Sequence, residues 1–156
     1  MTTTTTEVRL SPPPRALMRM LNPLVRRVLT TRWLGRRIPL MALLEFGGRR
    51  SGATFRVPVC LHTIDGTPTV FTPRSWRLNF TEPAPVVVTQ GGRVRHGRAV
   101  LLHATPRERG LAMRQALDNG ATPFELGLKV ARGHHITAAD LETVGNALIR
   151  IDFTEE

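Results

Sequence analysis

The chain has 156 residues, a length typical of one domain with its own hydrophobic core. Its charge is strongly positive, with 22 Lys and Arg against 12 Asp and Glu, and Lys129 is its single lysine. Arginine suits bidentate contacts with phosphates and carboxylates, so this charge is either functional or a compositional preference for arginine. The single cysteine, Cys60, excludes an internal disulfide, argues against a Cys-based metal site and suits a reducing cytoplasm. The sequence shows neither a secretory signal nor an apolar run of about 20 residues.

The N-terminal region is predicted to contain a tail and a helix. Residues 1–14, with a threonine-rich start and a triple proline, predict a disordered tail ahead of a single domain over 15–156. From Arg15 to about Trp33, apolar side chains recur at helical spacing among arginines, and Pro23 predicts a kink or two short helices. We expect this basic amphipathic helix either to pack on the sheet of its own domain or to lie on an anionic membrane surface.

A series of strands follows, separated by turn signals. Asp65-Gly66 and Gly91-Gly92 are turns of the kind that joins antiparallel strands. One or two helical turns are expected in the interruption at 73–85, which contains "RSWRLNF". The predicted strands cover Pro39–Phe46, Thr54–Ile64, Pro68–Thr72, Pro85–Gln90 and Arg93–His103. This order favours an antiparallel meander.

The last third of the chain is predicted to be mostly helical and to end in a strand. Thr105 and Thr137 are N-cap residues, each followed three positions later by a carboxylate. The predicted helices cover Pro106–Asn119, Phe124–Arg132 and Ala138–Val144, and Ala147–Phe153 is a closing strand expected to pair with an early one. Meanders of this kind usually close into barrels, so we expect an α+β, mainly β fold: a largely antiparallel barrel of about six strands with helices around it.

No catalytic or metal site can be assembled from sequence motifs. Ser51 and Ser75 do not lie in a G-x-S-x-G nucleophile elbow, and Cys60 sits among apolar residues in mid-strand, where a buried structural thiol is expected. His134 and His135 are adjacent and point apart, with no carboxylate at a metal-ligand spacing. The remaining histidines are isolated in predicted strands, where one could line a pocket: His62, His96 and His103.

The loop "GGRRSG" is better equipped to bind an anion. It combines glycine N–H groups with two guanidinium groups and a hydroxyl, from Arg49, Arg50 and Ser51, but it lacks the lysine and the spacing of a P-loop. A second basic group, Arg74 and Arg77 around an aromatic ring, follows the next hairpin. In an antiparallel meander these loops can meet at one end of the barrel, which predicts a ligand with an anionic tail and a flat ring. Nucleic acid would satisfy the charge, but an aromatic content of 5% without tyrosine disfavours it.

Four segments together resemble a known family. "LNPLVRRVL", "GGRRSGATFRVPV", "SWRLNF" and "PVVVTQGGRVRHGRAVLL" look like the deazaflavin-dependent nitroreductase family of actinobacteria, which are split β-barrel proteins related to flavin-binding pyridoxamine-phosphate-oxidase-like barrels. The resemblance covers roughly residues 21–102 and the closing strand. Its anchors are Gly48–Gly52, Val57-Pro58 and Trp76–Asn79.

The resemblance implies a split barrel that binds coenzyme F420, in preference to FMN. Its reduced ring would pass a hydride to a quinone, a nitro compound or an activated alkene, while the protein binds and orients the reactants. The basic N-terminal helix would guard the substrate mouth or touch the membrane. The implied cofactor-binding residues are Arg49, Arg50, Ser51 and Gly52 at the phosphate-bearing tail with Arg74 beside them, Pro58, Val59 and Cys60 along the deazaflavin ring, and Trp76 and Asn79 around the pocket.

The chain departs from the family pattern in two places. "FTPRSW" is shorter than the family's Gly-rich, Lys-containing loop before the tryptophan, which leaves Arg74 as the basic residue there. The family's C-terminal helix carries tyrosine, whereas this chain has none, so we assign neither a proton donor nor any other catalytic residue.

Two other classes of function remain open. One is a non-catalytic barrel that binds a flavin, haem, a fatty acid or another amphipathic small molecule. The other is a nucleic-acid or membrane-surface module that needs only the net charge. Split barrels of this kind often pair, so a homodimer is also expected. We expect the protein in the cytoplasm, with peripheral membrane contact through the N-terminal helix.

Overall fold

The computed structural model describes residues 8–10 and 40–154 of the chain. These residues form the strands β1 (Val8–Leu10), β2 (Met41–Gly47), β3 (Thr54–Cys60), β4 (His62–Ile64), β5 (Thr67–Thr72), β6 (Ala84–Gln90), β7 (Arg93–Leu101), β8 (Leu128–Val130) and β9 (Ala147–Phe153). They also form the 3-10 helices η1 (Ser75–Phe80) and η2 (Phe124–Leu126) and the α-helices α3 (Pro106–Asp118) and α4 (Ala138–Thr143).

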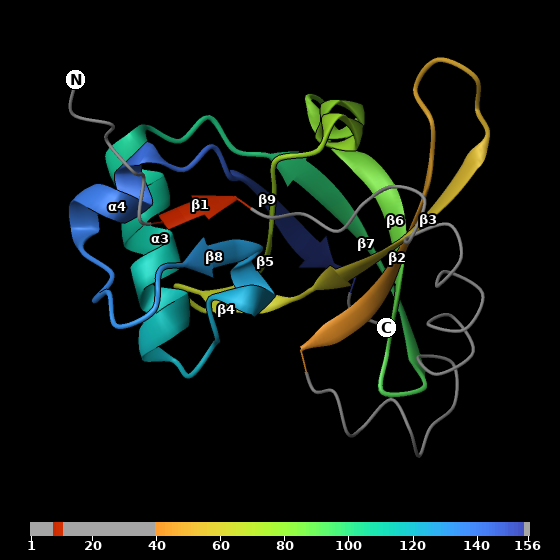
Figure 1. The fold of residues 1–156 in the computed structure, drawn as a ribbon. Helices are drawn as coiled ribbons and strands as arrows, with labels where there is room; N and C mark the ends of the chain where they lie inside the picture. The colour runs from red at the N-terminus through yellow and green to blue at the C-terminus, as the bar shows by residue number, and fades with distance from the viewer. Residues whose placement is uncertain (1–7, 11–39, 155–156) are drawn as a thin grey trace.

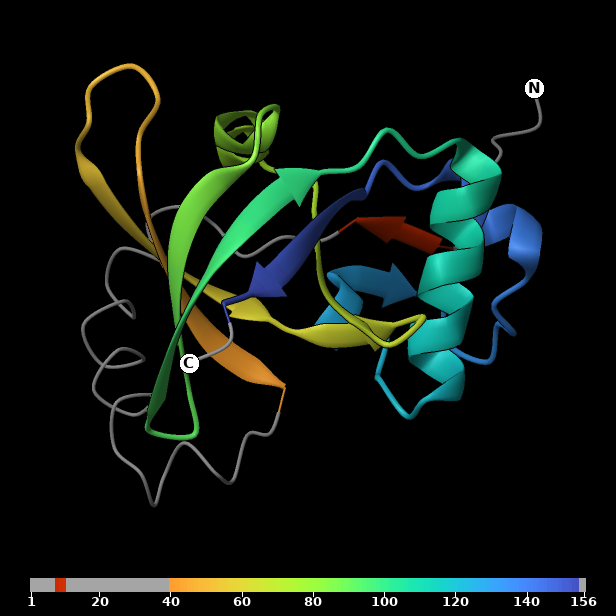
Figure 2. The same ribbon diagram turned by 180° about the vertical axis from the view of Figure 1, so that it is seen from behind.

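Seven strands make one curled antiparallel sheet in the order β3-β2-β6-β7-β9-β5-β4 (Figures 1 and 2). The two edge strands are consecutive in the chain, and Leu61 between them donates its N–H to the carbonyl oxygen of Leu40 over 2.7 Å. The segment β3–β4 therefore ends its pairing with β2 and begins to pair with β5 within a few residues. In addition, β3 itself contacts β5. The fold is a split β-barrel, with six strands when β3 and β4 are counted as one bent strand. The predicted closing strand is β9, which pairs with β5 and β7.

One apolar cluster fills the barrel. Side chains of a strand alternate between its two faces, so β2, β6 and β9 contribute every second residue to this cluster. Its members include Ala42, Leu44 and Phe46 from β2, Val86 and Val88 from β6, and Ile149 and Ile151 from β9. Complete burial of a leucine or isoleucine side chain contributes roughly 1.5–3 kcal/mol, so this cluster is a main source of stability.

A second apolar cluster joins the helices to the outside of the barrel. Met113 of α3 and Leu141 of α4 are fully buried there, against Leu148 of β9. Polar contacts hold the same helix to the β4–β5 turn: the Asp65 N–H donates to Gln115 Oε1 over 3.2 Å, and Gln115 Nε2 donates to Asp65 Oδ1 over 3.3 Å. Consequently α3, α4 and β8 lie together at one side of the barrel (Figure 1).

The predicted N-caps set the starts of both α-helices. Thr105 Oγ1 accepts the Glu108 N–H over 3.1 Å, and Thr137 and Asp140 form a capping box. Asp140 Oδ2 accepts the Thr137 N–H and also bonds His134 Nε2, each at 2.8 Å. These bonds, chiefly the one from the Thr137 backbone, hold the pKa of Asp140 below its usual value.

Two sequence predictions are wrong within the described residues. The helix predicted over Phe124–Arg132 is only the short η2, because Gly127 adopts φ 70° and the chain then enters β8. The tail predicted over 1–14 includes β1, which pairs with β8 and buries Val8. The predicted basic helix from Arg15 to about Trp33 lies outside the described residues. Within them, none of the helices is long and apolar enough to cross a membrane.

Gly97 of β7 permits the close approach of β9, and its replacement should destabilise the barrel. A Cβ at this position would lie 2.6 Å from the Asp152 carbonyl oxygen and 3.1 Å from Phe153 Cα. We expect Gly97→Ala to lower the free energy of unfolding by about 1–3 kcal/mol, measured by urea denaturation. Gly47→Ala, where a Cβ meets no atom within 4 Å, is the matched control and should change it by less than about 0.5 kcal/mol. Equal effects of the two variants would contradict this explanation.

Candidate functional site

The β2–β3 hairpin ends in a tight loop that uses several of its own backbone donors. The Gly48 N–H donates to the Ala53 carbonyl and the Gly52 N–H to the Gly48 carbonyl, both over 2.8 Å. Ser51 Oγ accepts the Ala53 N–H over 3.2 Å. Gly52 has φ 69°, a left-handed conformation that favours glycine. The glycines therefore shape the loop, and their N–H groups are not available to cradle a ligand.

The hairpin tip meets η1, as the sequence predicted for the two basic loops. The Arg49 N–H donates to Asn79 Oδ1 over 2.9 Å, and Asn79 Nδ2 donates to the Trp76 carbonyl over 2.8 Å. One amide side chain thus fastens the tip to the turn that carries the tryptophan. This role of Asn79 is an addition to its predicted place in the pocket wall.

An aromatic cluster supports both loops from beneath. The Phe46 ring lies 5.6 Å from Phe55, 5.7 Å from Trp76 and 5.0 Å from Phe80, measured between centroids. Phe80 is fully buried, Trp76 is half-buried and Phe55 is exposed at 44%. The cluster therefore anchors the loops to the barrel core and leaves apolar ring surface at the outside. Sequence patterns indicate only Trp76, because Phe46 looks like an ordinary core residue of its strand and Phe80, in the interruption at 73–85, carries no signal that sets it apart.

The arginines of the two loops have different surroundings. Arg49 and Arg50 are exposed, and their guanidinium groups make no hydrogen bond or ion pair with another described residue. Arg77 instead donates from Nη1 to the carbonyls of Pro73 and Arg74, both over 3.0 Å, so it braces its own turn. Arg74 is half-buried on the same turn. The positive charge directed to solvent at this end of the barrel comes chiefly from the hairpin tip.

The predicted ring-binding residues lie at the other end of β3. These residues pair with the start of β2: Pro58 with Leu43, Val59 with Ala42 and Cys60 with Met41. The hairpin tip follows the opposite end of β2, after Gly47. With about 3.3 Å per residue, Thr54 and Cys60 are separated by roughly 20 Å along the strand. Val59 is buried in the barrel core, while Pro58 and Cys60 are half-buried. Only an elongated ligand could touch the tip and these residues together.

Cys60 and His62 are both placed in low-polarity surroundings beside η2. Burial, with a smaller contribution from the Glu125 carboxylate, raises the pKa of the Cys60 thiol to about 11. His62 is 3% exposed, its Nε2 lies 3.4 Å from the Glu125 carbonyl oxygen, and burial lowers its pKa. The thiol therefore stays protonated at neutral pH, in agreement with the predicted structural role. Among the described residues, no cluster of His, Cys, Asp and Glu could hold a metal ion.

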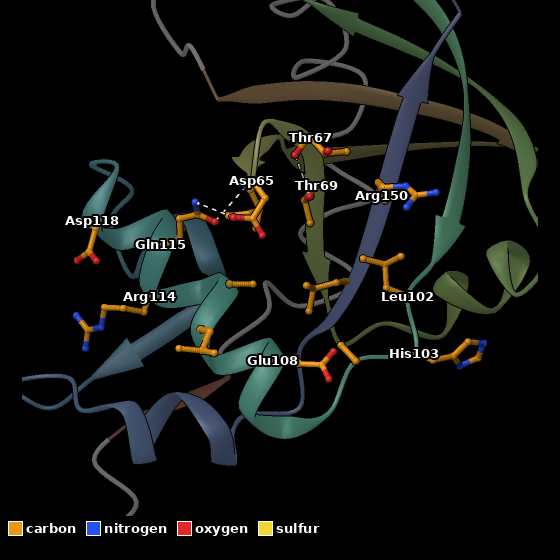
Figure 3. A pocket seen from close by; sticks show the side chains of 15 residues that line it. Asp65, Thr67, Thr69, Leu102, His103, Glu108, Arg114, Gln115, Asp118 and Arg150 are labelled. Carbon is orange, nitrogen blue, oxygen red and sulfur yellow. Dashed lines mark hydrogen bonds between the residues drawn. The ribbon is translucent and has the colours of Figure 1, made fainter.

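Two grooves are formed by other residues. The first, which we call the helix groove, has a volume of about 810 Å³ between α3 and the outer face of β5 and β9 (Figure 3). Its walls carry mixed charges, from Asp65, Glu108 and Arg150 among others. The second, which we call the end groove, has a volume of about 1090 Å³ where β7 begins and β9 ends. None of the predicted cofactor-binding residues lines either groove, but two of the histidines considered as pocket residues do: His103 lines the helix groove and His96 the end groove.

Removing the Asn79 amide should loosen the hairpin tip. Asn79→Ala loses the bonds to the Arg49 N–H and the Trp76 carbonyl, so it should cost about 1 kcal/mol of stability and speed hydrogen exchange of the Arg49 amide. Asn79→Asp keeps an acceptor for that amide and should preserve most of its protection. Exchange rates from NMR distinguish the two variants, and unchanged exchange of Arg49 in the alanine variant would contradict the assigned contact.

Cys60 should react slowly in the native protein. Its pKa rises from 9.0 to about 11, so at pH 8 the thiolate should be about 100-fold scarcer than in the unfolded chain. We expect alkylation by iodoacetamide, followed by mass spectrometry, to be slower by about that factor than in guanidinium chloride. The native rate should rise steeply toward pH 11. Equal rates in the native and unfolded protein would show that the thiol is neither buried nor protonated as described.

No protein-family model matches the sequence, and no curated protein matches it. Solved structures do resemble the fold. A domain-swapped dimer superposes with a TM-score of 0.50 and 16% sequence identity, over 90% of this chain and 100% of that chain. Another structure gives a TM-score of 0.43 and 16% identity, over 78% of this chain and 80% of that chain. At such identities the likeness is one of fold: the chain is similar to known proteins in architecture.

Proposed function

We propose that the protein is an oxidoreductase that binds coenzyme F420 and passes a hydride from its reduced ring to a quinone, a nitro compound or an activated alkene. The observation that carries this proposal is the hydrogen bond between the Arg49 N–H and Asn79 Oδ1. It joins the two loops on which the family resemblance depends, although 30 residues separate them in sequence. Their meeting is what a shared binding site for one ligand requires.

The donors at the tip fit the anionic tail of such a cofactor. Because Gly48, Arg49, Gly52 and Ala53 already use their N–H groups, the phosphate would be held by guanidinium forks and by the N–H groups of Arg50 and Ser51. Arg49 and Arg50 are exposed, and the one acidic residue on the hairpin, Glu45, is paired with Arg56 over 2.6 Å. A charge-assisted contact to a carboxylate or phosphate suits these arginines.

The cofactor's ring would lie away from the tip, along β3. Trp76 offers a half-buried aromatic wall beside the tip, and Pro58 and Cys60 lie farther down the strand. The roughly 20 Å between Thr54 and Cys60 suits an elongated cofactor whose tail and ring contact different ends of the strand. The bound cofactor supplies the hydride chemistry, while the residues described here bind its tail and orient it. The protonated Cys60 takes no nucleophilic part.

We further propose that the protein works in the cytoplasm, in contact with a membrane surface. The single cysteine favours a reducing cytoplasm, and the basic segment at 15–33 favours contact with a membrane, where quinones dissolve. We also propose a homodimer, which is consistent with one solved structure of similar fold being a domain-swapped dimer.

Binding of purified coenzyme F420 tests this function directly. Quenching of the coenzyme's fluorescence should saturate at micromolar protein. Arg50→Ala should raise the dissociation constant about tenfold or more, because one charge-assisted contact is lost. Arg107→Ala, at an exposed arginine on α3, is the matched control and should bind as the parent protein does. No quenching at tens of micromolar protein would reject the proposal.

Binding assays with other ligands separate the competing functions. FMN or a fatty acid that binds when coenzyme F420 does not would favour the non-catalytic barrel. If coenzyme F420 binds, the reduced form should be oxidised on addition of a quinone, as followed by its absorbance. Binding without any oxidation by quinone, nitro or alkene acceptors would retain the cofactor assignment and reject the reductase assignment.

A further inference from the structure

The end groove has an unusual charge pattern on its β7 wall. The inward face of β7 carries Gly97 and Ala99, which are buried, and Ala99 belongs to the barrel cluster. Alternation places Arg93 and Arg95 on that same face, while Val94, 54% exposed, faces outward. Both arginines are exposed, so the start of the strand carries arginine on the face that is buried farther along, and an apolar side chain on the opposite face. A departure from the usual alternation of apolar and polar residues is expected at a functional site such as a ligand-binding site.

The strand register confirms where these arginines lie. Arg95 pairs with Val88, Val88 with Leu44 and Leu44 with Val57, so the four residues form one row across four strands. The other three members of the row pack in or against the barrel cluster. Arg95 thus extends the core row at its open end. Gly97 has no side chain, so β9 can approach β7 closely at this position, where Gly97 pairs with Phe153. This pairing brings Phe153 close to Arg95.

The Phe153 ring lies against the guanidinium group of Arg95. The Arg95 Cζ atom lies 3.6 Å from the centroid of the Phe153 ring, a cation–π contact. A guanidinium whose face lies on an aromatic ring keeps the N–H groups at its edge available for hydrogen bonds. Such a planar fork matches the geometry of a carboxylate or a phosphate.

The charge in the end groove is not neutralised by the described residues. Its one lining carboxylate, Asp152, lies on the outer face of β9 and pairs with Arg150, Nη2 to Oδ2 at 3.2 Å. Neither Arg93 nor Arg95 has a described acidic partner. The groove volume of about 1090 Å³ is sufficient for a small molecule.

We propose that the end groove is an oxyanion-binding site, in which Arg95 and Arg93 bind the carboxylate or phosphate group of a small molecule. Arg95 supplies a bidentate contact from its stacked guanidinium, and Arg93 adds a second charge two residues away on the same face. The site is separate from the hairpin tip, since it is built from β5, β7 and β9. It does not depend on the proposed cofactor.

The test is an NMR titration of the ¹⁵N-labelled full chain with inorganic phosphate and, separately, benzoate. Ionic strength is kept constant with sodium chloride, and benzamide serves as the uncharged analogue of benzoate. We expect saturable shifts at the amides of Arg93–Gly97 and Phe153 and at the Arg95 Nε–H, with no saturable shift from benzamide. Saturation by phosphate alone or by benzoate alone would identify the oxyanion class within the same site.

Matched variants separate binding from a merely structural role of Arg95. Arg95→Gln should raise the dissociation constant about tenfold or more. Arg95→Lys keeps the charge but not the planar guanidinium, so its dissociation constant should lie between those of Arg95→Gln and the parent protein. Arg95→Met keeps the packing on Phe153 and should fold normally while losing binding. Arg50→Ala should leave this titration unchanged, which keeps its outcome independent of coenzyme F420 binding. Shifts that never saturate, or an Arg95→Gln variant that binds as the parent does, would overturn the proposal.

Discussion

The architecture depends on one constraint, the passage of the chain from β3 to β4 across Leu61. The segment pairs with β2 on one side of this residue and with β5 on the other, so the two edges of a curled sheet are parts of one bent strand. Because the edges are covalently linked, the sheet must curl, and its inward side chains must pack together. The barrel core and the two open ends of the barrel both follow from this linkage.

The two ends of the barrel carry different chemistry. At one end the hairpin tip and η1 bring together exposed arginines, an aromatic cluster and an amide that connects them. At the other end, the start of β7 carries exposed arginines on the face that is buried farther along, and one guanidinium makes a cation–π contact with Phe153. Between the ends the interior is apolar and filled. Ligand chemistry is therefore expected at the ends, where loops and strand termini are free of the packing demands of the core.

The second apolar cluster, around α3 and α4, adds a layer to the outside of the barrel. It covers β4, β5 and β9 with helices and with the β1–β8 pair, in which a segment near the N-terminus reaches residues some 120 positions later. Sequence patterns did not indicate this pair, since "LKV" and "VRL" are too short for alternation to be recognised. The polar contacts between Gln115 and Asp65 likewise join residues 50 positions apart.

The sequence by itself determined the local elements of this protein. Apolar and valine-rich runs identified β2 and β6, and alternation identified β9. Asp-Gly and Gly-Gly placed the hairpin turns, and Thr105 and Thr137 placed the helix starts, because each signal lies within a few neighbouring residues. Only the tertiary structure decided which side chains meet. The fastening of Arg49 by Asn79, the separation of Cys60 from the hairpin tip and the stacking of Arg95 on Phe153 all depend on strand pairing and curvature. Those are set by the packing of the whole core, which no local stretch of sequence encodes.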